Sequence, residues 1–205
     1  MTHTNTRLTD EQLATLHHAL VGYARRATRT EEAEYPLAAD PDRHLGVLRA
    51  FDLPRKGLTT SASFGFANET WQHRNFPDRI ELVQAWDNPS TDYERLMVTV
   101  IESALAERQH PKPGILYQDA ARAADLPDLA ERMPHATVLY PYLWKNGFHK
   151  VDLGTARVWF LQVVPLYQNE SDFIEKHGIK KFEERLEYTG ARFERLQRVS
   201  HLDIG

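Results

Sequence analysis

The stretch that decides the fold is RVWFLQVVPL, residues 157–166. Its run from Val158 to Val164 is almost continuously apolar, which is typical of a strand covered on both faces of a sheet. A shorter apolar segment, residues 151–153, precedes it across Gly154-Thr155-Ala156. Two apolar segments separated by a short glycine-containing connection predict a hairpin. We therefore expect residues 158–164 to form a central strand that is paired with the segment before it.

The segment after this strand predicts two consecutive helices. Ser171–His177 and Ile179–Glu187 are separated by Gly178, and glycine commonly ends a helix in the left-handed conformation. The apolar face of the second helix carries Ile179, Phe182 and Leu186. Glu170 lies just before the first helix, where a carboxylate can accept hydrogen bonds from free backbone amides. We assign Glu170 this structural role.

The first half of the chain predicts a helix followed by three strands. Thr9-Asp10-Glu11-Gln12 is typical of a capping box, and apolar residues recur at helical spacing as far as Tyr23. Arg29 to Asp42 is polar and is interrupted by two prolines, so we expect a loop there. The expected strands are Leu45–Leu53, Gly57–Phe66 and Arg79–Trp86.

The middle of the chain adds a second helix and shorter elements. Thr91-Asp92-Tyr93-Glu94 predicts a capping box, and the helix behind it ends at Pro111–Gly114. Further along we expect a short strand at Ile115–Tyr117, an irregular segment with one helical turn at Ala120–Met133, and a strand at Ala136–Trp144 that bends at Pro141. The predicted fold class is α+β: a mixed, mostly antiparallel sheet with helices packed against it, in a single domain over residues 1–205.

Composition narrows the function. The chain has 205 residues, no cysteine and a net charge of −4. Disulfides, thiolate metal sites and cysteine nucleophiles are therefore excluded, which fits the reducing cytoplasm. The charge gives no case for binding nucleic acid, and no apolar run reaches the ~20 residues that a membrane helix needs. We also expect no cofactor, because no glycine-rich phosphate loop occurs and the ten histidines lack metal-ligand spacing.

The sequence leaves two classes of function open besides protein binding: an enzyme and a structural subunit. An enzyme would need a site built from dispersed polar residues, for which His73, Glu81 and His149 are candidates. A structural subunit of a larger assembly would need a large apolar surface for self-association.

Residues 71–76 point to a binding role instead. This polar stretch, WQHRNF, contains two large aromatic side chains and an arginine, the residue types enriched at interface hot spots. We predict that Trp71, Arg74 and Phe76 contact a protein partner. Trp86 and Trp144, at the ends of predicted strands, are expected to close the core.

Three blocks resemble the suppressor-of-fused family. They are LTTSASFGF (residues 58–66) with the RIELVQAW strand behind it, the region from PGILY (residues 113–117) to YPYLW (residues 140–144), and residues 158–187. Together they extend from about residue 45 to residue 187. The chain departs from the family pattern at Ala62, where the resemblance leads us to expect a glycine.

The resemblance implies a non-enzymatic, protein-binding module of the stand-alone bacterial type. Bacterial members are thought to act largely as immunity proteins in polymorphic toxin systems, so the implied partner is a toxin domain. The large second domain of the animal signalling members does not follow. The resemblance implies neither a metal nor catalytic residues, and pairing of a partner segment with a sheet edge is the binding mode to look for first.

Overall fold

The central strand of the sheet is β8 (Arg157–Leu166), the apolar stretch from which the fold was predicted. On one side it pairs in parallel with β4 (Asp78–Trp86). On the other side it pairs antiparallel with β7 (Lys150–Asp152) and then with β6 (His135–Leu139). The predicted hairpin and central strand are therefore confirmed. The computed structural model describes residues 7–38, 40–69, 71, 78–88, 90–145, 147–190 and 192–203.

The described residues form one eight-stranded sheet in the order β1-β2-β3-β4-β8-β6-β5, with β7 beside β8. The remaining strands are β1 (Arg29–Leu37), β2 (Asp40–Phe51), β3 (Thr59–Phe64) and β5 (Leu116–Tyr117), of which β1 and β5 end the strand order. Only the pairing of β4 with β8 is parallel among these strands, so the sheet is mixed and mostly antiparallel, as predicted.

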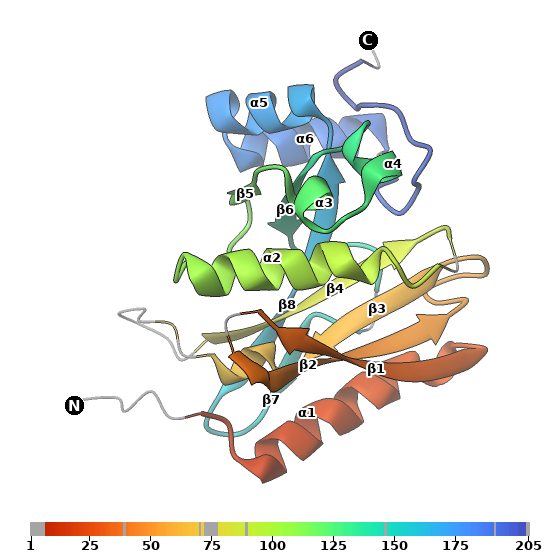
Figure 1. Ribbon diagram of the computed structural model, residues 1–205. Helices are drawn as coiled ribbons and strands as arrows, with labels where there is room; N and C mark the ends of the chain where they lie inside the picture. Colours follow the sequence, from red (N-terminus) through yellow and green to blue (C-terminus); the bar gives the residue numbers. More distant parts are fainter. Residues whose placement is uncertain are drawn as a thin grey trace.

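Helices cover both faces of the sheet (Figure 1). On one face lie α2 (Glu94–Ala106) and the short helices α3 (Ala120–Ala123) and α4 (Pro127–Ala130). The opposite face is covered by α1 (Asp10–Tyr23), whose Leu16 and Leu20 are buried against the sheet. The helices α5 (Gln168–His177) and α6 (Ile179–Thr189) pack over the far ends of β6 and β8. The single α+β domain is thus a sheet between two helical layers.

Local sequence chemistry explains most of these boundaries. The α1 capping box forms as predicted: Gln12 N–H donates to Thr9 Oγ1 at 3.2 Å, and Thr9 N–H donates to Gln12 Oε1 at 3.0 Å. Gly178 separates α5 from α6 at φ 81° and ψ 160°. That conformation is open to glycine, but it is not the left-handed helical turn that the sequence predicted. Trp86 and Trp144 are buried, which confirms their predicted places in the core.

Three other expectations are corrected. Arg29–Asp42 is not a loop, because it forms β1 and the start of β2. The predicted capping box before α2 does not form: the N-cap residue is Tyr93, without a side-chain cap, and Glu94 turns into the protein. The irregular segment after residue 120 contains two short helices rather than one turn.

Candidate partner-binding surface

The longest edge strand of the described sheet is β1, which the sequence did not predict. β1 has nine residues, whereas β5, at the opposite end of the strand order, has only two. β1 carries three carboxylates, Glu31, Glu32 and Glu34, and we call this strand the acidic edge. An edge strand presents unpaired N–H and C=O groups that an extended segment of another protein can pair with.

The inner side of the acidic edge is anchored by a buried polar cluster around Glu94. One oxygen of this carboxylate accepts hydrogen bonds from Arg49 Nε at 2.6 Å and Ser61 Oγ at 2.8 Å. The other accepts the hydroxyl of Tyr35, on β1, at 2.8 Å. Burial, and then the nearby Glu94 carboxylate, raises the pKa of Tyr35. The cluster ties β1 to β2, β3 and the start of α2, so the edge is held in place before any partner arrives.

The carboxylates along the acidic edge differ in how far they are paired. Glu32 Oε1 lies 2.8 Å from His17 Nε2 of α1. Glu31 Oε1 lies 3.2 Å from Arg29 Nε, and its Oε2 lies 3.6 Å from Nη1 of Arg49, a member of the buried cluster. Glu34 is exposed and has no ion-pair partner within the part of the chain that the structure describes. Glu34, and Glu32 beside it on the same exposed face, are therefore the carboxylates that a basic partner segment can reach.

The structure describes one of the three residues that were predicted to contact a partner. Trp71 is half-buried, and its ring packs edge-on against Phe66 at 5.8 Å and against His110 at 5.5 Å between ring centres. It borders the core under α2. Arg74 and Phe76 lie outside the described residues. The partner-binding role of Trp71, Arg74 and Phe76 stays a prediction.

Glu81, a candidate for an enzyme site, is fully buried and holds a turn of the backbone. Its carboxylate accepts hydrogen bonds from Ser63 Oγ at 2.5 Å, Gly65 N–H at 2.8 Å and Ala67 N–H at 3.0 Å. Burial raises the pKa of Glu81 to about 7, although these hydrogen bonds oppose the shift. All of these contacts serve the connection after β3, so the geometry assigns this carboxylate a structural role.

His149, a second enzyme candidate, does not join Glu81 in a shared site. Glu81 lies opposite Phe160 in the sheet, and Phe160 N–H donates to the carbonyl of His149 at 2.9 Å. The fully buried Phe160 thus separates the two polar residues. The exposed ring of His149 donates from Nε2 to the carbonyl of Trp144 at 2.5 Å. His73 lies outside the described residues.

Glu170 caps α5, as predicted, and also forms a buried ion pair with Arg198. Its Oε2 accepts a hydrogen bond from Tyr167 N–H at 3.1 Å, which confirms its capping role at α5. The same carboxylate accepts hydrogen bonds from both terminal nitrogens of Arg198, at 2.7 and 2.6 Å, and from His201 N–H at 3.0 Å. Arg198 also donates to the carbonyl of Pro165 at 2.8 Å. This buried pair fastens the C-terminal segment to the end of β8.

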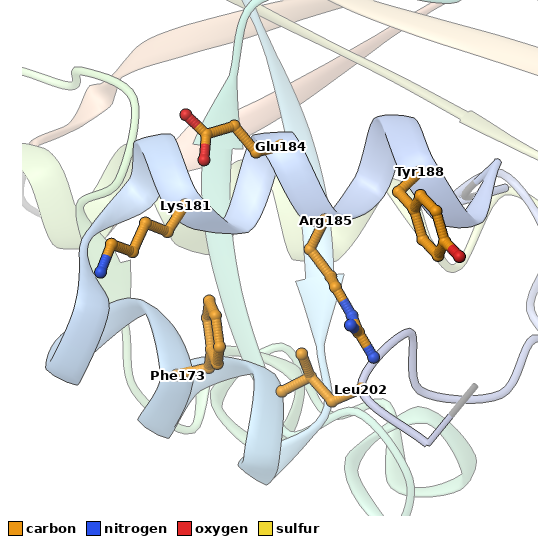
Figure 2. Close-up of a pocket in the computed structure, with 6 residues that line it drawn as sticks. All are labelled: Phe173, Lys181, Glu184, Arg185, Tyr188 and Leu202. Carbon is orange, nitrogen blue, oxygen red and sulfur yellow. The ribbon is translucent and has the colours of Figure 1, made fainter. Parts of the chain in front are cut away.

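A groove of about 710 Å³ lies between α5, α6 and the C-terminal segment. Figure 2 shows Phe173, Arg185 and Leu202 converging on it, while Glu184 points away from them on the far side of α6. Tyr188, at the end of α6, also lines the groove and is 85% exposed. The lining is mostly apolar and has no convergent acid and base, so its chemistry suits contact rather than catalysis.

Across residues 7–38, 40–69, 71, 78–88, 90–145, 147–190 and 192–203, no group of three or more His, Cys, Asp or Glu side chains could hold a metal ion. Within the same ranges no helix is long and apolar enough to cross a membrane.

The class of protein that this sheet and these helices define is confirmed by comparison with known families. The family model described as suppressor of fused protein (SUFU) matches residues 41–198, more than half of the chain. The chain belongs to the suppressor of fused protein family.

Individual relatives agree with this assignment. The immunity protein YqcF of Bacillus subtilis (strain 168) is 23% identical over 145 residues, covering 70% of this chain and 74% of that protein. The crystal structure of a SUFU homologue from Neisseria gonorrhoeae FA 1090 is similar with a TM-score of 0.72 and 13% identity, over 94% of this chain and 98% of that one. A chain of the Sufu–Fu complex is similar with a TM-score of 0.69 and 11% identity, over 94% of this chain and 93% of that one. At these identities the structural likenesses establish the fold.

Proposed function

We propose that this protein is a non-enzymatic protein-binding module that acts as an immunity protein and blocks a cognate toxin of a bacterial polymorphic toxin system. The observation that carries the proposal is the similarity to YqcF, which is named an immunity protein and is matched over most of both chains. A similar fold occurs in a structure of a Sufu–Fu complex, which supports a role in binding another protein. The proposal places this action in the cytoplasm of the cell that makes the toxin.

The acidic edge supports a specific mode of binding. An extended, basic segment of the toxin would add a strand beside β1, so that main-chain hydrogen bonds provide affinity and the glutamates provide charge complementarity. The toxin would then be blocked because this protein covers its active surface. The contacts predicted for Trp71, Arg74 and Phe76 would add to this interface.

Function is tested by recovering the partner and asking whether this protein neutralises it. The tagged protein is purified from its native cell, and a polypeptide recovered in near-equal amount is identified by mass spectrometry. That polypeptide is then expressed in a host that contains neither protein. We expect growth arrest, relieved when this protein is co-expressed. A recovered polypeptide that does not arrest growth, or an arrest that co-expression leaves unchanged, would refute the immunity role.

The binding mode is tested separately by reversing charge on the acidic edge. In the variant E32K/E34K both substituted side chains are exposed, so the fold should be retained. We expect the association rate with the toxin to fall at least about tenfold at low salt, and less as salt rises, because rim charges act mainly on the encounter. The matched control E175K/E187K makes the same change in net charge at exposed positions of α5 and α6. Equal losses in both variants would show that only net charge matters, and would refute binding at β1.

A further inference from the structure

A second hollow, of about 410 Å³, has an electrostatic character opposite to that of the acidic edge. One wall is the turn between β2 and β3, which contributes Arg55 and Lys56. The other wall is the segment after α6, which contributes Arg192 and Arg195. We call this hollow the basic groove; its remaining lining residues are Gly57, Leu58 and Asp87. All four cations are exposed side chains of a protein whose net charge is −4.

The two walls are fixed to each other by hydrogen bonds. Asp87, at the end of β4, donates its N–H to the carbonyl of Glu194 at 2.9 Å and accepts the N–H of Leu196 on Oδ1 at 3.0 Å. Arg55 crosses from the opposite wall to form an ion pair with Glu194, whose side chain is 2% exposed. A site whose walls are already joined loses little freedom when it binds a ligand.

The charges of the basic groove are only partly balanced. Glu194 neutralises Arg55, and Asp87 lines the groove. A third carboxylate, Asp52, accepts the N–H of Gly57 at 2.8 Å and interacts electrostatically with Lys56. Within the part of the chain that the structure describes, Lys56, Arg192 and Arg195 have no ion-pair partner. Four cations and three carboxylates leave a net charge of +1, and both cations of the C-terminal wall, Arg192 and Arg195, are among those without an ion pair of their own.

We infer that the basic groove binds a phosphorylated small molecule through its phosphate group. A phosphate ester carries about −1.5 to −2 charges near neutral pH and presents three acceptor oxygens, whereas a carboxylate carries one charge and presents two oxygens, so a phosphate can contact cations of both walls at once. The guanidinium groups of Arg192 and Arg195 can each donate two parallel hydrogen bonds to phosphate oxygens. The volume lies within the ~300–1,000 Å³ that is typical of small-molecule sites.

The same observations argue against a nucleic-acid polymer. A long polyanion would extend beyond this hollow onto a protein of net charge −4, where it would be repelled. A small ligand contacts only the local positive field. The inference is independent of the immunity role, because it concerns a different surface and needs no toxin for its test.

The test is calorimetric titration of the full chain with inorganic diphosphate at about 0.15 M salt, where surface charges are screened beyond about 8 Å. We expect a sub-millimolar Kd, and binding of citrate, a carboxylate anion of high charge, at least about tenfold weaker. The variant R192Q/R195Q should lose at least about tenfold in affinity for diphosphate while its unfolding midpoint stays unchanged. The matched control K176Q/K180Q, on exposed residues of α5 and α6, should bind as the parent does.

Three results would overturn the inference. Absence of binding at millimolar diphosphate would show that the groove is not an anion site. Equal affinity for diphosphate and citrate would show a response to charge without phosphate recognition. Equal losses in R192Q/R195Q and K176Q/K180Q would show that the anion does not bind between these two walls.

Discussion

Glu170 and Glu81 are both fully buried carboxylates, yet the protein holds them in different ways. Glu170, at the start of α5, is paired with the guanidinium of Arg198 through two short hydrogen bonds. Glu81, on β4, receives its hydrogen bonds from the Ser63 hydroxyl and from backbone amides of residues 65–67, all of which are neutral donors. A cation can offset the desolvation of a buried carboxylate, whereas neutral donors do so only in part. The first carboxylate is therefore a clamp and the second a titrating group.

The largest change in stability is expected when Glu170, the clamp, loses its ion-pair partner Arg198. The substitution R198M leaves Glu170 buried without its counterion and removes the hydrogen bond to Pro165, so we expect a loss of about 3–5 kcal/mol in the free energy of unfolding. Urea denaturation measures this. R195M, at an exposed position in the same segment, should change the free energy by less than about 0.5 kcal/mol.

The double variant E170M/R198M sharpens this comparison. Because the buried charge and its counterion disappear together, most of the loss seen in R198M should be recovered. A loss below about 1 kcal/mol in R198M would show that the ion pair is not what holds the C-terminal segment.

The second effect is the change in stability with pH that Glu81 is expected to cause. Burial raises the pKa of Glu81 from 4.5 to about 7 in the folded protein, so the folded state keeps the proton that the unfolded state loses. The contribution of Glu81 to the free energy of unfolding should therefore be greatest below pH 4.5, fall by about 3 kcal/mol as pH rises to about 7, and then level off. Denaturation of the parent protein and of E81Q across this range measures the contribution, because the variant lacks it. Parallel stability curves for the two proteins would contradict the assignment.

The smallest effect is expected at an exposed ion pair. Arg95 lies 3.2 Å from Asp125, whose side chain is 90% exposed, so water screens both charges. The substitution R95Q should change the free energy of unfolding by less than about 0.5 kcal/mol. A loss comparable to that of R198M would mean that burial does not govern the strength of ion pairs in this protein.

The sequence was most informative where the apolar pattern was continuous. β8 and its hairpin partner were predictable because residues 158–164 leave almost no polar face, and α1 was predictable because its capping box is encoded within four residues. β1 was missed because its exposed positions carry glutamates and a proline, which are typical of loops. The available signal was the alternation of Ala33, Tyr35 and Leu37, which are partly or fully buried, with exposed residues between them.

The polar sites were less predictable because they depend on tertiary contacts. Glu94 fits a capping box in sequence, but Arg49 and Ser61 draw its side chain into the protein. The capping role of Glu170 was predictable from its place just before the helix expected at Ser171, although α5 begins at Gln168, whereas its partner Arg198 lies 28 residues further on. The basic groove joins residues 55–58 with residues 192–195, and no local pattern connects these segments.

The glutamates of β1 also govern how copies of this protein meet one another. If two copies joined through β1, Glu31, Glu32 and Glu34 would face a second set of the same carboxylates, and like charges across paired strands are destabilising. Pro36 removes one backbone donor from the same strand. Pairing of two copies through β1 is therefore disfavoured, while the strand remains open to a segment of opposite charge.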